Sequence, residues 1–171
     1  SLVERLRRIM LRTVWAITEQ MKLGKFDTVD SEVSFRMDKE KQTYIGRVDR
    51  IDTMETEENI YVKIVDYKTG KKDLSLSDLY YGLQLQLMVY LRAAVDKQTR
   101  RSKKMVIPAG VLYYHIEDPF VTSRLDFEEK RTYLLNELLM RGLVNEEDPV
   151  LPSLDATLAG EEGALAASAK S

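Results

Sequence analysis

Three charged residues near the ends of two predicted strands have the types and spacing to do chemistry together. Asp66 and Lys68 are separated only by Tyr67, and Asp49 precedes them on another predicted strand. Side chains two residues apart in a strand share a face, so Asp66 and Lys68 project together while Tyr67 points the other way. If the two strands form a hairpin through the polar residues 53–58, Asp49 lies beside Asp66. Two carboxylates and an ammonium group then meet at one point.

Such a cluster suits the hydrolysis of a phosphodiester bond. The carboxylates of Asp49 and Asp66, with the backbone carbonyl of Tyr67, are the oxygen donors that Mg²⁺ or Mn²⁺ prefers. A divalent cation polarises a phosphate oxygen and lowers the pKa of a water molecule. Lys68 can orient or deprotonate that water and offset the charge that builds up on the phosphate. The other interpretation is that these residues form only a cross-strand ion pair.

A second pair of residues follows on a predicted helix. Gln86 and Tyr90 are four residues apart and therefore lie one helical turn apart on one face. A glutamine can hydrogen-bond a phosphate or a base, and a tyrosine can stack on a base or hydrogen-bond a phosphate. The pair could bind nucleic acid, and the alternative is that Tyr90 belongs to the core.

The periodicity of apolar residues predicts the elements that position these side chains. The chain is expected to form a helix, three antiparallel strands, a helix, a strand and a helix. Their expected ranges are 2–22, 32–37, 43–51, 59–68, 75–96, 105–116 and 126–141. Gly142 is expected to end the last helix, so a mixed α/β domain covers residues 1–144. Residues 145–171, acidic and then rich in alanine, are expected to form a mobile tail or a loosely attached piece.

The amino-acid composition excludes several kinds of metal site and covalent cross-link. The 171 residues include no cysteine and one histidine, His115. Disulfides, thiolate zinc sites, an iron–sulfur cluster held by this chain and a multi-histidine metal site are excluded, and any metal must be held mainly by oxygen. No apolar run approaches the roughly 18 residues that cross a bilayer, and the first residues do not resemble a signal peptide. We therefore expect a cytoplasmic protein without a membrane partner.

Charge is distributed unevenly along the chain. The net charge is −2, and residues 143–171 hold six acidic residues and only one lysine, so the rest is slightly positive. Two basic clusters stand out, Lys71-Lys72 and Arg100-Arg101-Ser102-Lys103-Lys104. They are compatible with a local basic groove, and the other interpretation is a solvated loop, because strong nucleic-acid binders are usually more basic overall.

Three short motifs resemble those of a known family. In this order, Gly46-X-X-Asp49, Asp66-Tyr67-Lys68-Thr69 and Gln86-X-X-X-Tyr90 resemble the PD-(D/E)XK nuclease superfamily, in its RecB-like branch. Residues 80–87 and 113–119 are similar to the C-terminal nuclease domain of the AddB family of bacterial helicase–nuclease subunits. The resemblance covers residues 2–144. It implies an α/β, restriction-endonuclease-like core of αβββαβ order with an extra C-terminal helix.

The resemblance also implies roles for individual residues. Asp49 and Asp66 would be metal ligands, Lys68 the catalytic lysine, and Gln86 and Tyr90 the residues that contact DNA. The implied activity is Mg²⁺-dependent or Mn²⁺-dependent hydrolysis of DNA, on a single strand fed by a helicase, in double-strand break repair and recombination. The implied partner is an AddA-like helicase subunit.

Two features depart from the family pattern. The RecB-like pattern begins with a histidine on an N-terminal helix, whereas residues 2–22 contain none and His115 lies on a later strand, in a position that looks structural. Many AddB proteins also hold an iron–sulfur cluster, and this sequence has no cysteine. Both absences fit a piece of a longer protein that starts after the first motif, so we expect weak metal affinity. Glu32 and Asp52 are further acidic residues, and Asp52 falls on the strand face opposite Asp49.

Two other functions stay open at this stage. A catalytically incomplete module with the same fold could bind DNA or a helicase partner. An unrelated α/β protein could use the same charged residues only for ion pairs.

Overall fold

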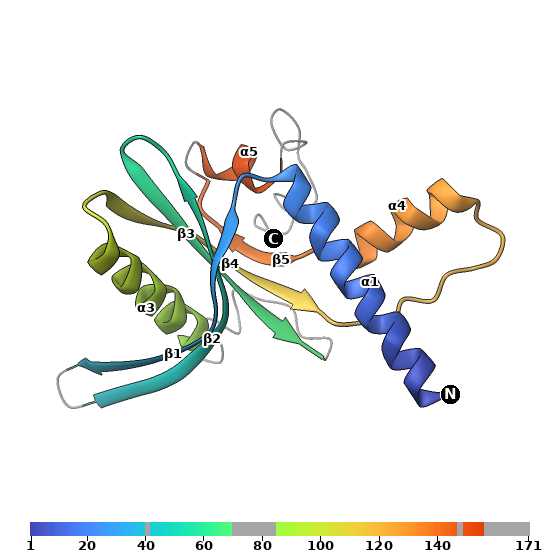
Figure 1. Ribbon diagram of the computed structural model, residues 1–171, viewed down its shortest axis with the longest axis horizontal. Helices are drawn as coiled ribbons and strands as arrows, with labels where there is room; N and C mark the ends of the chain where they lie inside the picture. Colours follow the sequence, from blue (N-terminus) through green and yellow to red (C-terminus); the bar gives the residue numbers. More distant parts are fainter. Residues whose placement is uncertain (40–41, 70–84, 147–148, 156–171) are drawn as a thin grey trace.

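The computed structural model describes residues 1–39, 42–69, 85–146 and 149–155, which are built around a five-stranded sheet (Figure 1). The strands are β1 (Asp27–Lys39), β2 (Gln42–Glu55), β3 (Asn59–Lys68), β4 (Met105–His115) and β5 (Arg141–Val144). They lie side by side in chain order. The pairs β1–β2, β2–β3 and β4–β5 are antiparallel, and β3–β4 is parallel.

The helices confirm the predicted order of elements. They are α1 (Leu2–Leu23), α3 (Leu85–Arg101), α4 (Phe127–Glu137) and α5 (Val150–Leu154). The mixed α/β class and the sequence helix, three strands, helix, strand, helix are therefore as predicted. The expected start of the second helix, at residues 75–84, lies outside the described residues. Along the described helices, no stretch is both long and apolar enough to cross a bilayer.

The β2–β3 hairpin is the element that carries the charged motifs. Its strands pair with Arg50 opposite Val65 and Glu55 opposite Ile60. The connecting turn is closed by Thr56, whose backbone N–H donates to the carbonyl of Asn59 at 2.9 Å. The predicted antiparallel meander is confirmed, with β2 extending four residues further than predicted, to Glu55.

The two faces of the sheet are covered by different helices (Figure 1). On one face α3 packs over inward side chains of β2, β3 and β4, with Leu87, Ile64 and Val111 among the buried residues. On the other face α1 and α5 cover clusters around Val65 and Val150. Because strand side chains alternate, consecutive residues of β3 such as Ile64 and Val65 belong to different clusters.

The last predicted helix is shorter than expected. Asp126 caps α4 with a capping box, in which its carboxylate accepts from the Glu129 N–H at 2.8 Å. The helix ends at Glu137 instead of residue 141, and residues 141–144 form β5 beside β4. The prediction that Gly142 stops a helix is therefore wrong. Gly142 lies in the strand, where an added Cβ would stand 2.0 Å from the Val111 carbonyl oxygen.

Part of the expected C-terminal tail packs onto the domain. Val150 and Leu154 of α5 are buried with Phe26 and Ala109. The carbonyl of Ser153 accepts from the Lys25 N–H at 2.7 Å, which ties α5 to the residues just after α1. This short helix is thus attached to the core, whereas residues 156–171 lie outside the described part and the domain boundary at 144 stays a prediction.

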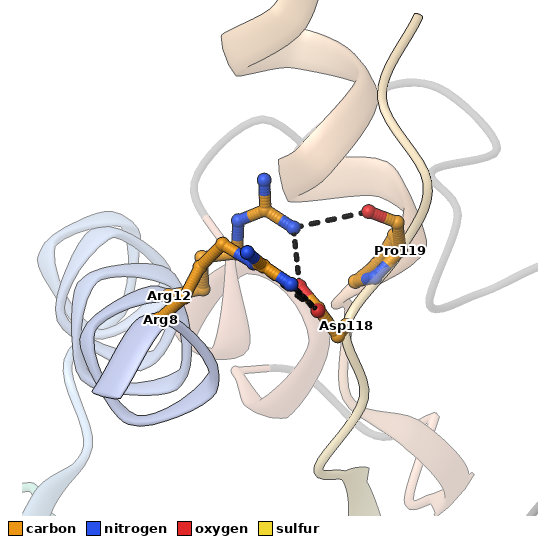
Figure 2. Close-up of polar contacts among 4 residues, drawn as sticks. All are labelled: Arg8, Arg12, Asp118 and Pro119. Carbon is orange, nitrogen blue, oxygen red and sulfur yellow. Dashed lines mark hydrogen bonds and ion pairs between the residues drawn. The ribbon is translucent and has the colours of Figure 1, made fainter. Parts of the chain in front are cut away.

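Helix α1 is attached chiefly through its second half. Ala16 is its one buried residue, while Leu6, Met10 and Val14 are exposed, so the predicted helix is confirmed but much of its apolar side faces outward. Nearer its start, α1 holds the segment that follows β4 (Figure 2). Arg8 and Arg12 donate to the Asp118 carboxylate at 2.5–3.1 Å and 2.6 Å, and Arg12 also donates to the Pro119 carbonyl at 3.0 Å.

Candidate active site

The motif residues converge where β3 ends. One oxygen of the Asp49 carboxylate accepts from the backbone N–H of Tyr67 at 2.9 Å. The Lys68 ammonium lies 2.7 Å from Asp66 Oδ2. The hairpin therefore places Asp49 of β2 beside the Asp66-Tyr67-Lys68 segment of β3, as the sequence predicts.

The Asp66 carboxylate carries an electrostatic cost. Its side chain is only 13 % exposed, whereas that of Lys68 is 44 % exposed. Burial raises the pKa of Asp66, the nearby Asp49 carboxylate raises it further, and the hydrogen bond and charge of Lys68 act in the opposite direction. One cation is thus not enough to offset the burial of Asp66 and its repulsion by Asp49.

This donor set fits a divalent cation in kind. Asp49 and Asp66 supply carboxylate oxygens, the hard donors that Mg²⁺ and Mn²⁺ take. Among the described residues no group of three or more histidine, cysteine, aspartate or glutamate side chains is placed to hold a metal. Further donors would have to come from the backbone, where the predicted contribution is the Tyr67 carbonyl, or from water. The Tyr67 ring itself packs edge-on to Tyr114, on the opposite face of the sheet.

Gln86 and Tyr90 lie together at the start of α3. The Gln86 amide donates to the Tyr90 hydroxyl, so the predicted one-turn spacing is confirmed. Tyr90 is 9 % exposed, and its ring packs edge-on to Phe35, with centroids 5.2 Å apart. Gly46 leaves room for this ring, because an added Cβ would lie 2.6 Å from Tyr90 Cε1. The ring of Tyr90 is therefore a core group, and Gln86 presents the more exposed end of the pair.

Comparison with known proteins decides the family. A model of the PD-(D/E)XK nuclease superfamily matches residues 1–165. The chain belongs to the PD-(D/E)XK nuclease superfamily. Its five-stranded mixed sheet with flanking helices is consistent with the restriction-endonuclease-like fold of that superfamily.

Curated relatives point to one group of PD-(D/E)XK proteins, the AddB-type subunits of an ATP-dependent helicase/deoxyribonuclease. The chain is 42 % identical over 171 residues to the subunit from Lachnoclostridium phytofermentans, with 99 % of the chain covered. It is 38 % identical over 174 residues to the subunit of the same name from Ruminiclostridium cellulolyticum, with 94 % of the chain covered. The chain spans 15 % of the length of each of these relatives.

One polar residue close to the Asp49–Asp66–Lys68 cluster was not placed there by the sequence analysis. His115 ends β4 and is the parallel register partner of Lys68, just as Tyr113 is the partner of Asp66. It thus lies at the same edge of the sheet as the motif residues, whereas the sequence suggested only a structural position on a later strand. The strand–helix–strand order was the available signal, because such a crossover makes the two strands parallel and brings their C-terminal ends together.

Two other acidic residues stand apart from the site. Asp52 is fully buried on the opposite side of the hairpin, where Arg50 and Lys63 approach its carboxylate at 2.7 Å and 3.3 Å. Glu32 is exposed and pairs with Arg47 at 2.9 Å. Neither residue joins Asp49 and Asp66, so both have structural or surface partners instead.

Replacing Asp66 by asparagine is expected to abolish metal binding without lowering metal-free stability. Because the pKa of Asp66 is raised in the folded state, its ionised form destabilises the fold at neutral pH. That cost is fully present above the folded pKa and disappears as the pH falls toward the unfolded value of 3.8. Thermal melts in EDTA should therefore show Asp66→Asn as stable as the wild type or more stable at pH 7, with the difference vanishing in acid.

The matched control for this variant is Asp38→Asn. Asp38 is exposed, and hydrogen bonds from Thr43 and Arg36 lower the pKa of its carboxyl. Its replacement should give no gain in melting temperature, and Ca²⁺ titration should be unchanged. A clear drop in the metal-free melting temperature of Asp66→Asn would contradict the clustered-carboxylate picture.

Proposed function

We propose that the chain is a divalent-metal-dependent deoxyribonuclease domain that hydrolyses phosphodiester bonds of DNA. The observation that carries this proposal is the convergence of Asp49, Asp66 and Lys68 at the end of β3 in a PD-(D/E)XK chain. Asp49 and Asp66, with the Tyr67 carbonyl, would hold Mg²⁺ or Mn²⁺. When bound, the cation supplies Lewis acidity to the scissile phosphate.

The chain's own residues have distinct tasks in this proposal. Lys68 is exposed enough to reach a substrate and is held near the phosphate position by its ion pair with Asp66. Its ammonium orients the attacking water and offsets negative charge on the phosphate in the transition state. Gln86 contacts a phosphate or base from the start of α3, and Tyr90 fixes the Gln86 amide through its hydroxyl.

The names of the relatives support a setting for this activity. They are subunits of an ATP-dependent helicase/deoxyribonuclease. We propose that the domain acts in the cytoplasm beside an AddA-like helicase subunit, on a DNA strand that the helicase makes single-stranded. The biological role would be double-strand break repair and recombination.

A catalytically incomplete binding module is the second candidate. It is favoured by one observation, that the described residues provide only two side-chain ligands at the site. Such a module would bind DNA or a helicase partner without cleaving. It predicts that Ca²⁺ and Mn²⁺ titrations show no binding while DNA binding is retained.

The test is cleavage of an end-labelled single-stranded oligonucleotide with Mg²⁺ or Mn²⁺, with the wild type beside Asp66→Ala and the exposed control Glu128→Ala, in the first turn of α4. The nuclease proposal expects cleavage by the wild type and by Glu128→Ala and none by Asp66→Ala. Cleavage that survives in Asp66→Ala would overturn the assigned site. If no variant cleaves, the binding module is favoured.

A further inference from the structure

A groove between β1 and α3 lies outside the Asp49–Asp66–Lys68 cluster. It encloses about 580 Å³, within the range of roughly 300–1,000 Å³ that is typical of ligand sites. Figure 1 shows the β1–β2 hairpin running beside α3 and extending beyond the body of the sheet. Val33, Phe35 and Met37 of β1 line the groove, and as alternate residues of one strand they share a face. These three side chains give one side of the groove an apolar strip, and Ser34, Arg36 and Asp38 of the same strand also line the groove.

The opposite wall, formed by α3, is basic. Arg92, Lys97 and Arg100 line it, together with Ala93, Ala94 and the one acidic residue of this wall, Asp96. Arg92 is 66 % exposed and pairs with Asp96 at 3.0 Å, while Lys97 pairs with Asp30 at 3.1 Å.

The lining as a whole has more positive than negative side chains. Its cations are Arg36, Arg92, Lys97 and Arg100, and its carboxylates are Asp38 and Asp96.

The structure also divides the basic cluster at residues 100–104. Lys104 pairs with Glu55 at 2.8 Å and donates to the Thr56 carbonyl, so it fixes the β2–β3 turn. Arg101 pairs with Asp30 at 2.8 Å. Arg100 instead lines the groove, without an ion pair to any residue that the structure describes. One member of the cluster is therefore positioned to bind an anion.

An apolar strip facing a row of cations matches the chemistry of a single nucleic-acid strand, which carries phosphates on one side and unstacked bases on the other. We propose that this groove binds single-stranded nucleic acid, with phosphates against Arg92 and Arg100 and bases against Phe35 and Met37. A duplex does not fit this pattern, because its bases are stacked inside and only their edges and the phosphates face a protein. An acidic peptide that adds as a strand along the edge strand β1 is the alternative occupant. Its acidic side chains would make no apolar contacts with Val33, Phe35 and Met37.

The groove borders the proposed nuclease site. Phe35 packs against Tyr90, and Tyr90 accepts from Gln86, so the floor of the groove is continuous with the Gln86–Tyr90 pair. Tyr90 and Arg100 are ten residues apart on α3, which corresponds to about 15 Å of helix. The groove thus follows α3 away from the site. In this respect the inference rests on the proposed function, because the same strand would continue toward Lys68.

The test is binding of a fluorescein-labelled oligothymidylate to the full chain, measured by anisotropy in EDTA, where a divalent-metal-dependent nuclease cannot cleave it. The double variant Arg92→Gln/Arg100→Gln should bind about tenfold more weakly, with a salt dependence of log K that is shallower by about 1.4 for two lost phosphate contacts. Met37→Ser should weaken binding several-fold and leave the salt dependence unchanged. The control Arg7→Gln/Arg124→Gln removes two exposed arginines outside the groove and should match the wild type.

Several outcomes would overturn the groove assignment. They are no binding by the wild type, unchanged binding by the α3 double variant, an equal loss in the control, or competition by poly-L-glutamate as strong as that by unlabelled oligothymidylate. The last outcome would assign the groove to an acidic peptide. Thermal melts establish that each variant is folded. Cleavage by the wild type with unchanged binding of the double variant would reject the groove alone, and groove-dependent binding without cleavage would reject the nuclease proposal alone.

Discussion

Lys68→Ala is expected to lower the rate of DNA cleavage by about 10²–10⁴-fold, the usual contribution of a positioned proton-transfer group. The folded state should be retained, because the Lys68 side chain is 44 % exposed and its partner is a neighbouring carboxylate. Metal binding should persist or strengthen, since the ammonium no longer competes for Asp66. The measurement is a time course of oligonucleotide cleavage with Mn²⁺, alongside a Ca²⁺ titration.

The control for Lys68→Ala is Lys25→Ala, an exposed lysine just after α1. This variant should cleave at the wild-type rate. Loss of metal binding in Lys68→Ala would mean that the lysine organises the ligands. Cleavage at the wild-type rate would remove Lys68 from the mechanism.

The second large effect is expected on stability. Asp52→Ala should lower the free energy of unfolding by about 3–5 kcal/mol, the cost of removing one partner from a buried ion pair. Asp52 is fully buried, receives a hydrogen bond from Thr28 at 2.8 Å and is the shared partner of Arg50 and Lys63. Burial lowers the pKa of Lys63 and the Asp52 charge opposes that shift, so the lysine depends on this carboxylate. Urea denaturation of the two proteins in EDTA measures the difference.

A triple variant separates the charge from the packing. In Arg50→Met/Asp52→Leu/Lys63→Met no buried charge is left unpaired, and much of the lost stability should return. Asp38→Ala, which breaks an exposed pair with Arg36, should cost less than about 1 kcal/mol. An equally small loss of stability in Asp52→Ala would show that water reaches Arg50 and Lys63 once the carboxylate is removed.

The charged half of the candidate site could be predicted because it is local. Asp49, Asp66 and Lys68 lie on one hairpin, and alternation with a short turn is enough to place them on a common edge. The Gln86–Tyr90 contact follows from helical spacing alone. The burial of the Tyr90 ring could not be predicted from helical spacing, because it depends on contact with Phe35 and on the space that Gly46 leaves.

The parts that were wrong or missed depend on contacts between distant segments. A glycine after a helical pattern usually marks a helix end, but Gly142 is required by the close approach of β5 to β4. The exposure of Met10 on α1 cannot be read from its spacing, since periodicity gives the apolar side of a helix and not what covers it. His115 is placed beside Lys68 in the sheet by the parallel β3–β4 register, which joins segments distant in the sequence.

The parallel pairing of β3 with β4 has a consequence for how the chain folds. The β2–β3 hairpin can form from neighbouring residues, but the other edge of β3 is paired only when residues 105–115 join it as β4. In a chain synthesised from the N-terminus, β3 therefore has an unpaired edge until β4 is made, and its side chains include the apolar Ile60, Val62 and Ile64. Such a strand can pair with another chain, so aggregation during synthesis is the risk that accompanies this topology. Substitutions that delay the docking of β4 should reduce the yield of folded protein even where they leave every charged residue of the site in place.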